Sequence, residues 1–296
     1  MKETATTPYR GNVVGNARKK IQIKEQNQLS LSKESFNMSF EILTSELLVE
    51  FTMKVNESPL NKLNRIPQLE LPVDYFQFYK SVSSVYSSKI EGEDIDFDSY
   101  FKHKFMNVKF KADYTKKADD LYSAYEFIDT NSLNLKNVKK AHSILSSNLL
   151  PKSQQGQIRN NPMFVINSKD QIEYVAASPE SVNSELDKLF RDIELLQKKE
   201  LNSFEIFYYA SLIHLVFVKI HPFQDGNGRT ARLIEKWFLQ EKIGEKANSI
   251  QLEKNYYKKL TDYYHNIRKL GLEYEELNYK KSLDFLLMTI ESINEE

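Results

Sequence analysis

Apolar residues recur at helical spacing along most of this chain. The longest apolar run covers residues 204–220, and it is long enough for a buried helix. Beyond it, Leu233, Ile234, Trp237 and Phe238 repeat at the same spacing. The pattern predicts further helices over residues 38–55, 74–91, 97–105, 116–128, 136–150, 181–196, 228–240, 253–270 and 279–293. These elements predict an all-α fold.

One interval interrupts the helical pattern. Residues 163–166 and 171–175 are short runs of β-prone residues, and the polar residues 167–170 separate them. Two such runs with a short polar connection predict a β-hairpin. An ordinary surface hairpin would carry the same signal, so the pattern alone assigns it no function.

Composition and charge narrow the class of protein. The chain has 296 residues with 41% hydrophobic and 28% charged residues, which is typical of a globular fold. Basic and acidic residues number 41 each, so the overall balance favours neither nucleic acid nor an anionic membrane as partner. The absence of cysteine excludes disulfides and cysteine-ligated zinc. With no secretory signal and no run of membrane-spanning length, we expect a cytoplasmic protein.

The segment after the long apolar run reads HPFQDGNGRTAR over residues 221–232. Gly226 and Gly228 let the backbone turn sharply and approach a ligand. The helix that begins beside them offers unpaired N–H groups and a positive dipole end, which suit phosphate oxygens. Arg229 and Arg232 lie three residues apart and add guanidinium groups, which bind phosphate in a bidentate way. These residue types predict a polyphosphate site.

Three polar residues of the same segment suit catalysis. His221 should end the preceding helix, because the proline after it disfavours helical geometry, and an imidazole there could act as a general base. Asp225 could hold Mg²⁺ together with phosphate oxygens, and Asn227 could orient one of those oxygens. His142 and His214 lie on apolar helix faces and are expected in the core. A turn between helices would explain any fragment of the segment, but the whole string favours an active site.

Residues 221–232 resemble the signature of Fic-domain proteins, His-x-Phe-x-Asp/Glu-Gly-Asn-Gly-Arg-x-x-Arg, at every position. The resemblance implies a Fic-type helical bundle with a small β-hairpin flap. It implies an enzyme that transfers AMP from ATP to a Ser, Thr or Tyr hydroxyl of a target protein and releases pyrophosphate. Relatives that phosphorylate their targets carry Lys near the position of Gly228, so the glycine favours AMP transfer.

The same resemblance implies roles for individual residues. His221 would be the base, Asp225 would hold Mg²⁺, and residues 226–228 would form an anion hole. Arg232 would face the γ-phosphate. The residues implied to bind the nucleotide are Phe223, Gly226, Asn227, Gly228, Arg229 and Arg232, with Tyr256 and Tyr257 beside the adenine.

A second match lies upstream, in residues 87–92. Ser87, Glu91 and Gly92 fit the inhibitory motif of the family, Ser/Thr-x-x-x-Glu-Gly/Asn. In such proteins the glutamate pairs with the second arginine of the signature, which here implies that Glu91 binds Arg232 at the γ-phosphate position. A plain helix that ends at Gly92, with Glu91 in solvent, would have the same sequence.

The resemblance also suggests an organisation and leaves alternatives. It divides the chain into an N-terminal helical region, 1–110, that carries the inhibitory helix, and a catalytic domain, 111–296, that ends in C-terminal helices. A protein substrate is expected to dock on the flap, 163–175. The alternatives are a nucleotide-binding regulatory module, which would not need His221 as a base, and a hydrolase that removes AMP with the help of Glu91. The target, the activating signal and the oligomeric state, with a homodimer as one alternative, stay open.

Overall fold

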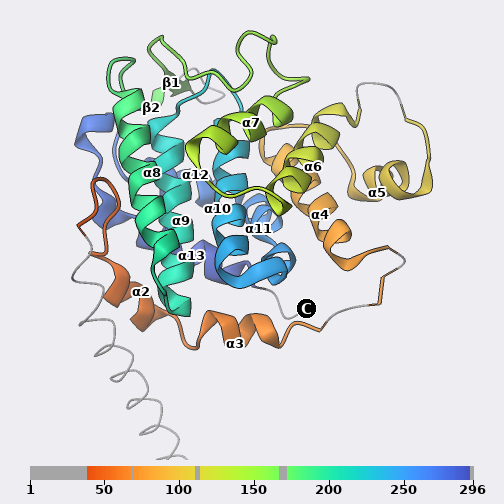
Figure 1. Cartoon of the computed structure of the whole chain (residues 1–296), viewed down its shortest axis with the longest axis horizontal. Coiled ribbons are helices and arrows are strands. Elements are labelled where there is room, and N and C mark those ends of the chain that lie inside the picture. The colour runs from red at the N-terminus through yellow and green to blue at the C-terminus, as the bar shows by residue number, and fades with distance from the viewer. Residues whose placement is uncertain (1–38, 68–69, 72, 111–113, 167–171, 294–296) are drawn as a thin grey trace, which may run out of the picture.

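The computed structural model describes residues 39–67, 70–71, 73–110, 114–166 and 172–293. Helices dominate these residues, with one small antiparallel hairpin, so the all-α class is confirmed (Figure 1). In chain order the elements are α2 (Leu48–Lys54), α3 (Pro59–Asn64), α4 (Tyr75–Ile90), α5 (Phe97–Met106), α6 (Lys116–Asp129), α7 (Leu135–Leu145), β1 (Phe164–Ile166), β2 (Ile172–Val175), α8 (Val182–Lys198), α9 (Ser203–Ile220), α10 (Asn227–Ile243), η2 (Gly244–Ser249), α11 (Leu252–Lys258), α12 (Leu260–Arg268), η3 (Tyr274–Glu276), η4 (Tyr279–Lys281) and α13 (Leu283–Glu291).

The central helix is α9, and α2, α8, α10 and α13 surround it. Asn202 and Glu205 form a capping box that fixes its first turn, since each side chain accepts a backbone N–H of the other residue. Among the described residues, α9 is the one helix that meets the length and composition of a membrane span, a property that the sequence analysis did not expect. In this fold, 94% of that span is buried.

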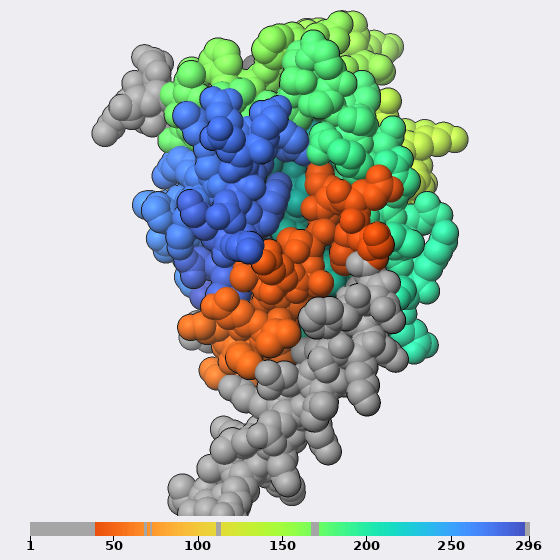
Figure 2. Space-filling model, turned by 90° about the vertical axis from the view of Figure 1, so that its left-hand side faces the viewer, coloured from red at the N-terminus to blue at the C-terminus, as the bar shows by residue number. Residues whose placement is uncertain are grey.

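The helices before residue 110 share the main core with the rest of the chain. Phe51 of α2 and Ile90 at the end of α4 belong to the same buried cluster as the side chains of α9 and α10. Figure 2 shows the orange residues that follow residue 38 lying between the blue C-terminal helices and the green α8. The expected boundary at 110 falls beside residues 111–113, which lie outside the described residues, and it stays a prediction.

The helix predicted over residues 38–55 begins much later than expected. The carboxylate of Asp192 accepts hydrogen bonds from the backbone N–H groups of Glu41, Ile42 and Leu43, at 2.8 to 3.1 Å. These contacts hold residues 41–43 in a non-helical turn, so α2 begins only at Leu48. The prediction was wrong here because the partner carboxylate comes from α8, far along the sequence.

Other helix limits also differ from the periodicity. The helix expected over 253–270 divides at Lys259, whose φ of −112° and ψ of 39° are not helical. The helix expected over 279–293 begins as the 3₁₀ turn η4 and becomes α-helical at Leu283. The short helix α3 was not predicted, although Pro59 at its first position is a typical start signal.

The predicted hairpin is present in the described residues. Strands β1 and β2 pair antiparallel, with Phe164 opposite Val175, whereas residues 167–171 of the predicted hairpin lie outside the described residues. The N–H of Val175 also donates to the carbonyl of Leu272, at 2.8 Å, which ties β2 to the segment after α12. Phe164 and Ile166 each expose about half of their surface, 53% and 51%, so the outer face of the hairpin is apolar.

Candidate active site

The loop between α9 and α10 carries residues 221–226 of the signature. Helix α9 ends at Ile220, as the proline predicted, and His221 takes the left-handed conformation with φ 52° and ψ 59°. Gly226 also has a positive φ, 78°, just before α10 begins at Asn227. The two left-handed residues turn the chain back, so the first turn of α10 faces the end of α9.

Two signature residues shape this loop from inside. Asn227 bonds both backbone groups of Phe223, with the N–H of Phe223 donating to Oδ1 and Nδ2 donating to the carbonyl oxygen, each at 2.8 Å. Phe223 is fully buried and stacks on the ring of His142 with centroids 3.6 Å apart. Both side chains are therefore engaged within the protein, and the binding roles implied for Phe223 and Asn227 stay predictions.

His142 ties the loop to α7, in agreement with its expected place in the core. Its Nδ1 accepts the N–H of Gly156 at 2.9 Å, so the proton must lie on Nε2, which donates to the carbonyl oxygen of Asp225 at 2.9 Å. Burial lowers the pKa of this imidazole to about 4. The neutral ring therefore carries one fixed tautomer that positions the metal-binding candidate.

The base candidate His221 is oriented by a residue that the sequence did not point to. Nδ1 of His221 lies 2.7 Å from the hydroxyl of Tyr174 in β2 and 3.1 Å from the carbonyl oxygen of Val218. The Tyr174 hydroxyl donates to the same carbonyl at 3.0 Å, so Nδ1 must carry the proton and donate. Nε2 is left with a free lone pair. Burial lowers the pKa of His221 to about 4, so this lone pair stays available at neutral pH.

We expect the imidazole of His221 to stay neutral when the pH falls from 8 to about 5. Its folded pKa lies below the ordinary 6.5, so the neutral form contributes stability that is complete above 6.5 and is lost as the pH falls through about 4. A pH titration by NMR with ¹³C-labelled histidine would measure this, with His221→Ala to assign the signal. A midpoint at 6.5 would contradict the buried, singly protonated ring.

Arg232 is held by residues of α4, with its C-cap Glu91, and of α12. Its guanidinium donates to the Glu91 carboxylate at 2.6 Å, to the Ser87 hydroxyl at 2.9 Å and to the Ser87 carbonyl at 3.1 Å. Nη1 also donates to the hydroxyl of Tyr263 in α12, at 3.2 Å. Gly92, with φ 85°, lets the chain turn away directly after Glu91. The structure therefore brings together the three residues of the upstream motif and the last residue of the signature.

Glu91 also lies over Gly228, a residue of the predicted anion hole. Its Oε1 lies 2.5 Å from the position that a Cβ on Gly228 would take, so a side chain there would displace the carboxylate. Burial opposes ionisation of Glu91, but the charges of Arg232 and Arg229 outweigh it and hold the pKa of this carboxyl below its ordinary value. Glu91 is therefore a carboxylate at neutral pH, and it lies over the backbone that would receive a phosphate.

The remaining cavity is small. It has a volume of about 130 Å³, and its lining includes His221, Gly228 and Arg232 together with Tyr174, Tyr263 and Tyr264. Ligand pockets for molecules of nucleotide size span roughly 300 to 1,000 Å³. The site in this conformation is thus too small for a nucleoside triphosphate, and Glu91 is part of its wall.

Arg229 is the cation with the fewest contacts in the site. Its guanidinium is 5% exposed and touches the Glu93 carboxylate at 3.3 Å, but its Nε is buried without a hydrogen-bond partner among the described residues. A buried donor without a partner is costly. A phosphate oxygen would satisfy it, so the residues present fit a polyphosphate beside the first turn of α10.

Asp225 remains exposed at the edge of the loop. One of its oxygens accepts the N–H of Gly226 at 2.6 Å, which leaves the other free. In the part of the chain that the structure describes, no group of three or more His, Asp or Glu side chains could hold a metal. A cation at Asp225 would therefore need oxygens of the ligand, an arrangement that Mg²⁺ adopts with nucleotide phosphates.

Tyr256 lies in a buried polar network that reaches Arg232 through Tyr263, and its implied place beside adenine stays a prediction. Its hydroxyl donates to the Glu235 carboxylate, which also binds His214 at 2.6 Å. Nε2 of His214 then meets the hydroxyl of Tyr263 at 3.0 Å, the same hydroxyl that accepts from Arg232. The network holds Arg232 through the hydroxyl of Tyr263. It also places His214 in the core, as its apolar helix face predicted.

Tyr257 also lies outside the cavity. Its ring packs on Tyr86, with centroids 5.7 Å apart, and Lys89 lies over it. Besides Tyr174, the tyrosines that line the cavity are Tyr263 and Tyr264, one or two helical turns beyond Tyr257. Their spacing from the signature carried no signal in the sequence, because α11 and α12 meet at a break that the periodicity did not predict.

Comparisons with known proteins agree with this geometry. Residues 132–239 match the family model described as Fic/DOC family. A Fic family protein from Desulfovibrio desulfuricans G20 has the same fold with a TM-score of 0.67 and 16% identity, over 86% of this chain and 74% of that one. A Fic domain containing signaling protein from Bacteroides thetaiotaomicron VPI-5482 matches with a TM-score of 0.62 and 19% identity, over 79% of this chain and 92% of that one. Fic-1 from C. elegans matches with a TM-score of 0.50 and 16% identity, over 96% of this chain and 76% of that one.

Proposed function

Because this chain is a Fic-domain protein, we propose that it transfers AMP from ATP to a Ser, Thr or Tyr hydroxyl of a target protein, and that Glu91 inhibits this reaction. One observation carries the proposal. His221 with its free Nε2, Gly228 and Arg232 line one cavity, so a base and the groups of an anion site lie together. A module that only bound a nucleotide would not need the base.

The chemistry follows from the positions of these groups. The oxygen of the target hydroxyl bonds to the α-phosphorus of ATP, and the bond from that phosphorus to the oxygen of pyrophosphate breaks. The hydroxyl proton passes to Nε2 of His221, whose Nδ1 is already protonated and held by Val218 and Tyr174. Arg229 and the first N–H groups of α10 would hold the phosphate oxygens. Mg²⁺, when bound at Asp225, would neutralise phosphate charge.

The proposed inhibition follows from the negative charge of Glu91 and from the space that its side chain fills beside Arg232 and Gly228. The Glu91 carboxylate occupies one face of Arg232 and lies over Gly228, where the terminal phosphate of ATP would need both groups. Two negative groups cannot share that position without a large electrostatic cost. ATP would then bind with its α-phosphate displaced from His221, or it would have to move the glutamate.

A labelling experiment tests the proposed reaction. The Glu91→Gly protein would be incubated with a cell lysate and ATP that carries radioactive label at either the α- or the γ-phosphate. We expect label in protein from the α-position alone, and mass spectrometry should find peptides that carry AMP. Transfer of the γ-label alone would show phosphorylation instead and would overturn the proposal.

Asp225→Ala should remove Mg²⁺-dependent transfer, because the loop contains no second carboxylate. We expect the loss at low Mg²⁺ and partial recovery at high Mg²⁺, where phosphate oxygens alone can hold the ion. Asp225→Asn keeps the contact with the N–H of Gly226 and serves as the milder variant. Normal transfer by Asp225→Ala at low Mg²⁺ would mean that another residue binds the metal.

A second activity is supported by the ionised state of Glu91. A carboxylate whose pKa is held low, at the rim of the cavity that contains His221, could orient a water molecule against an AMP-modified side chain. The protein would then also remove AMP. Purified AMP-modified target, incubated with wild type and with Glu91→Gly, separates the two directions, since release of AMP should require Glu91.

A further inference from the structure

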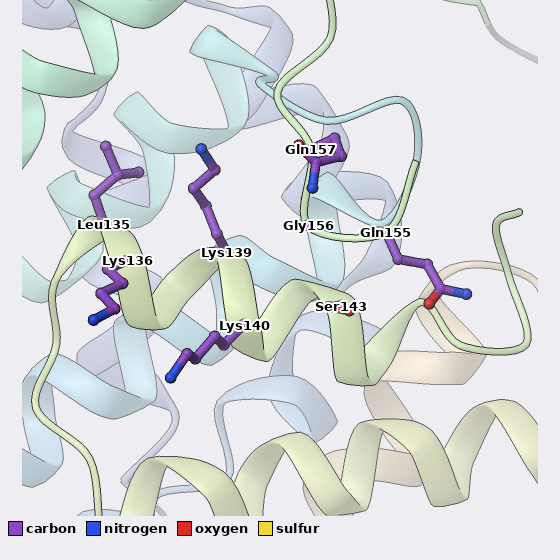
Figure 3. Close-up of a pocket in the computed structure, with 8 residues that line it drawn as sticks. All are labelled: Leu135, Lys136, Lys139, Lys140, Ser143, Gln155, Gly156 and Gln157. Atoms are coloured by element: carbon purple, nitrogen blue, oxygen red, sulfur yellow. The ribbon is translucent and has the colours of Figure 1, made fainter. Parts of the chain in front are cut away.

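A second cavity lies away from the active site, on the exposed face of α7. It has a volume of about 530 Å³ and lies between α7 and the segment at residues 155–157 (Figure 3). Its polar lining consists of Lys136, Lys139, Lys140, Ser143, Gln155 and Gln157. None of the roles assigned above uses these residues.

The lining is strongly basic in a chain without net charge. Three of the lining residues are lysines and none is acidic, although the whole chain has 41 residues of each sign. Among the described residues, no carboxylate pairs with Lys136, Lys139 or Lys140, whereas many other lysines of the fold have a partner. Lys139 is half-buried and lines the cavity, with no carboxylate partner in the part of the chain that the structure describes. The cavity therefore favours an anionic occupant.

The arrangement of the lysines distinguishes between kinds of anion. They occupy positions i, i+3 and i+4 of α7, which are neighbours on one helix surface. Figure 3 shows that Lys139 extends to one side of the helix, and Lys136 and Lys140 extend to the other. Their ammonium groups do not converge on one point, as a single phosphate would require. An extended chain with several carboxylates would meet them in succession.

We propose that this cavity binds an acidic segment of the target protein while a hydroxyl of the same target reaches His221. This inference rests on the proposed function, because it names a property of the substrate. The occupant is a polypeptide rich in Asp or Glu, and Gln155, Gln157 and Ser143 offer hydrogen bonds to its backbone. Exposed charge pairs of this kind contribute more to encounter rate and selection than to affinity.

The backbone connects the cavity to the catalytic loop over a short distance. Gly156 in its floor donates to His142, which donates in turn to the carbonyl of Asp225. Two residues beyond Gln157, the N–H of Arg159 donates to Pro222 at 2.9 Å and its Nε donates to the His221 carbonyl at 2.7 Å. Two residues span at most about 7 Å of extended chain. A target segment in the cavity would thus lie near the loop that carries the base, and the chain continues from there to β1 of the flap.

The first test measures binding without any catalysis. A fluorescein-labelled glutamate-rich peptide would be titrated by anisotropy against wild type, against the triple variant Lys136→Glu, Lys139→Glu and Lys140→Glu, and against a matched triple. The matched triple changes Lys199, Lys258 and Lys281 to Glu, which alters net charge equally at exposed lysines that have no carboxylate partner among the described residues. Inorganic phosphate and an oligouridine serve as competing ligands.

We expect the α7 triple to weaken peptide binding about tenfold or more and the matched triple to change it less than about twofold, with all binding weaker at high salt. Equal loss in both triples would show general charge attraction and overturn the inference. Displacement by low millimolar phosphate would assign the cavity to a small anion. Tighter binding of the oligouridine through the same lysines would assign it to nucleic acid. Either result also overturns the inference.

The second test measures the effect on the substrate. In the Glu91→Gly background, the α7 triple should reduce α-phosphate labelling of lysate proteins several-fold, whereas auto-modification and ATP binding stay within about twofold of that background. Unchanged lysate labelling would overturn the docking role. Loss of all labelling, both in Glu91→Gly and in Glu91→Gly combined with the α7 triple, would count against AMP transfer itself. The peptide titration would then still decide whether the cavity binds an acidic segment.

Discussion

Replacing His221 with alanine should lower the rate of AMP transfer by roughly 10²- to 10⁴-fold, the usual contribution of a positioned general base. The loss follows from the removal of Nε2, the atom left free when Val218 and Tyr174 hold Nδ1. ATP should still bind, because Arg229, Arg232 and the N–H groups of α10 remain. The rate is best measured in the Glu91→Gly background, with label at the α-phosphate of ATP and binding followed separately by calorimetry.

The matched control is His265→Ala, which removes an exposed imidazole from α12. It should leave the rate within about twofold, as expected for a surface substitution. Transfer by His221→Ala within a few-fold of its parent would exclude His221 as the base. Loss of both transfer and ATP binding would indicate that the substitution had disturbed the loop, and Tyr174→Phe would then report on orientation of the ring alone.

Replacing Glu91 with glycine should raise transfer by at least about tenfold. The substitution removes a charge-assisted hydrogen bond to Arg232, and such bonds contribute roughly 1.5 to 3 kcal/mol, where 1.4 kcal/mol corresponds to a factor of ten. It also clears the space over Gly228, where the glutamate oxygen now lies. The measurement is initial rate of auto-modification and of lysate labelling, at equal concentrations of folded protein.

Thermal melting provides an independent reading of the same change. Arg232 is almost fully buried, at 1% exposure, and keeps Ser87 and Tyr263 as partners when Glu91 is absent. The variant should therefore melt lower without ATP and gain more from ATP than wild type does, since a phosphate would replace the lost carboxylate. Asp94→Gly, at an exposed carboxylate nearby, is the matched control and should change neither quantity. A folded Glu91→Gly protein with unchanged or lower transfer would refute inhibition by this residue.

The signature could be interpreted from sequence because its chemistry is contiguous. His221, Asp225 and the two arginines keep fixed offsets, so local geometry alone predicts a loop between helices with a base on one side and an anion site on the other. The same residues could not show that the Asn227 side chain bonds the backbone of Phe223. A role in ligand binding and a role in loop shape would both require the same residue at this offset, so the sequence pattern does not distinguish the two roles.

Long-range partners explain most of what the sequence did not predict. Tyr174 reaches His221 from 47 residues away and Tyr263 reaches Arg232 from 31 residues away, and neither belongs to a motif. Asp192 of α8 likewise binds the backbone of Leu43 from 149 residues away, and this contact keeps α2 from beginning earlier. The hydrophobic pattern predicted helices well where one face is buried, as in α8, or where the whole helix is buried, as in α9. It failed at helix ends that a distant polar side chain determines.

The order of the two motifs along the chain has a consequence for the cell that makes the protein. Glu91 precedes Arg232 by 141 residues, and the two side chains are hydrogen-bonded in the folded protein. At synthesis rates of roughly 5 to 20 residues per second, Glu91 is added to the chain about 7 to 28 s before Arg232. The inhibitor is therefore already present when α10 first folds, so a nascent chain would have no interval in which the completed site could modify its neighbours.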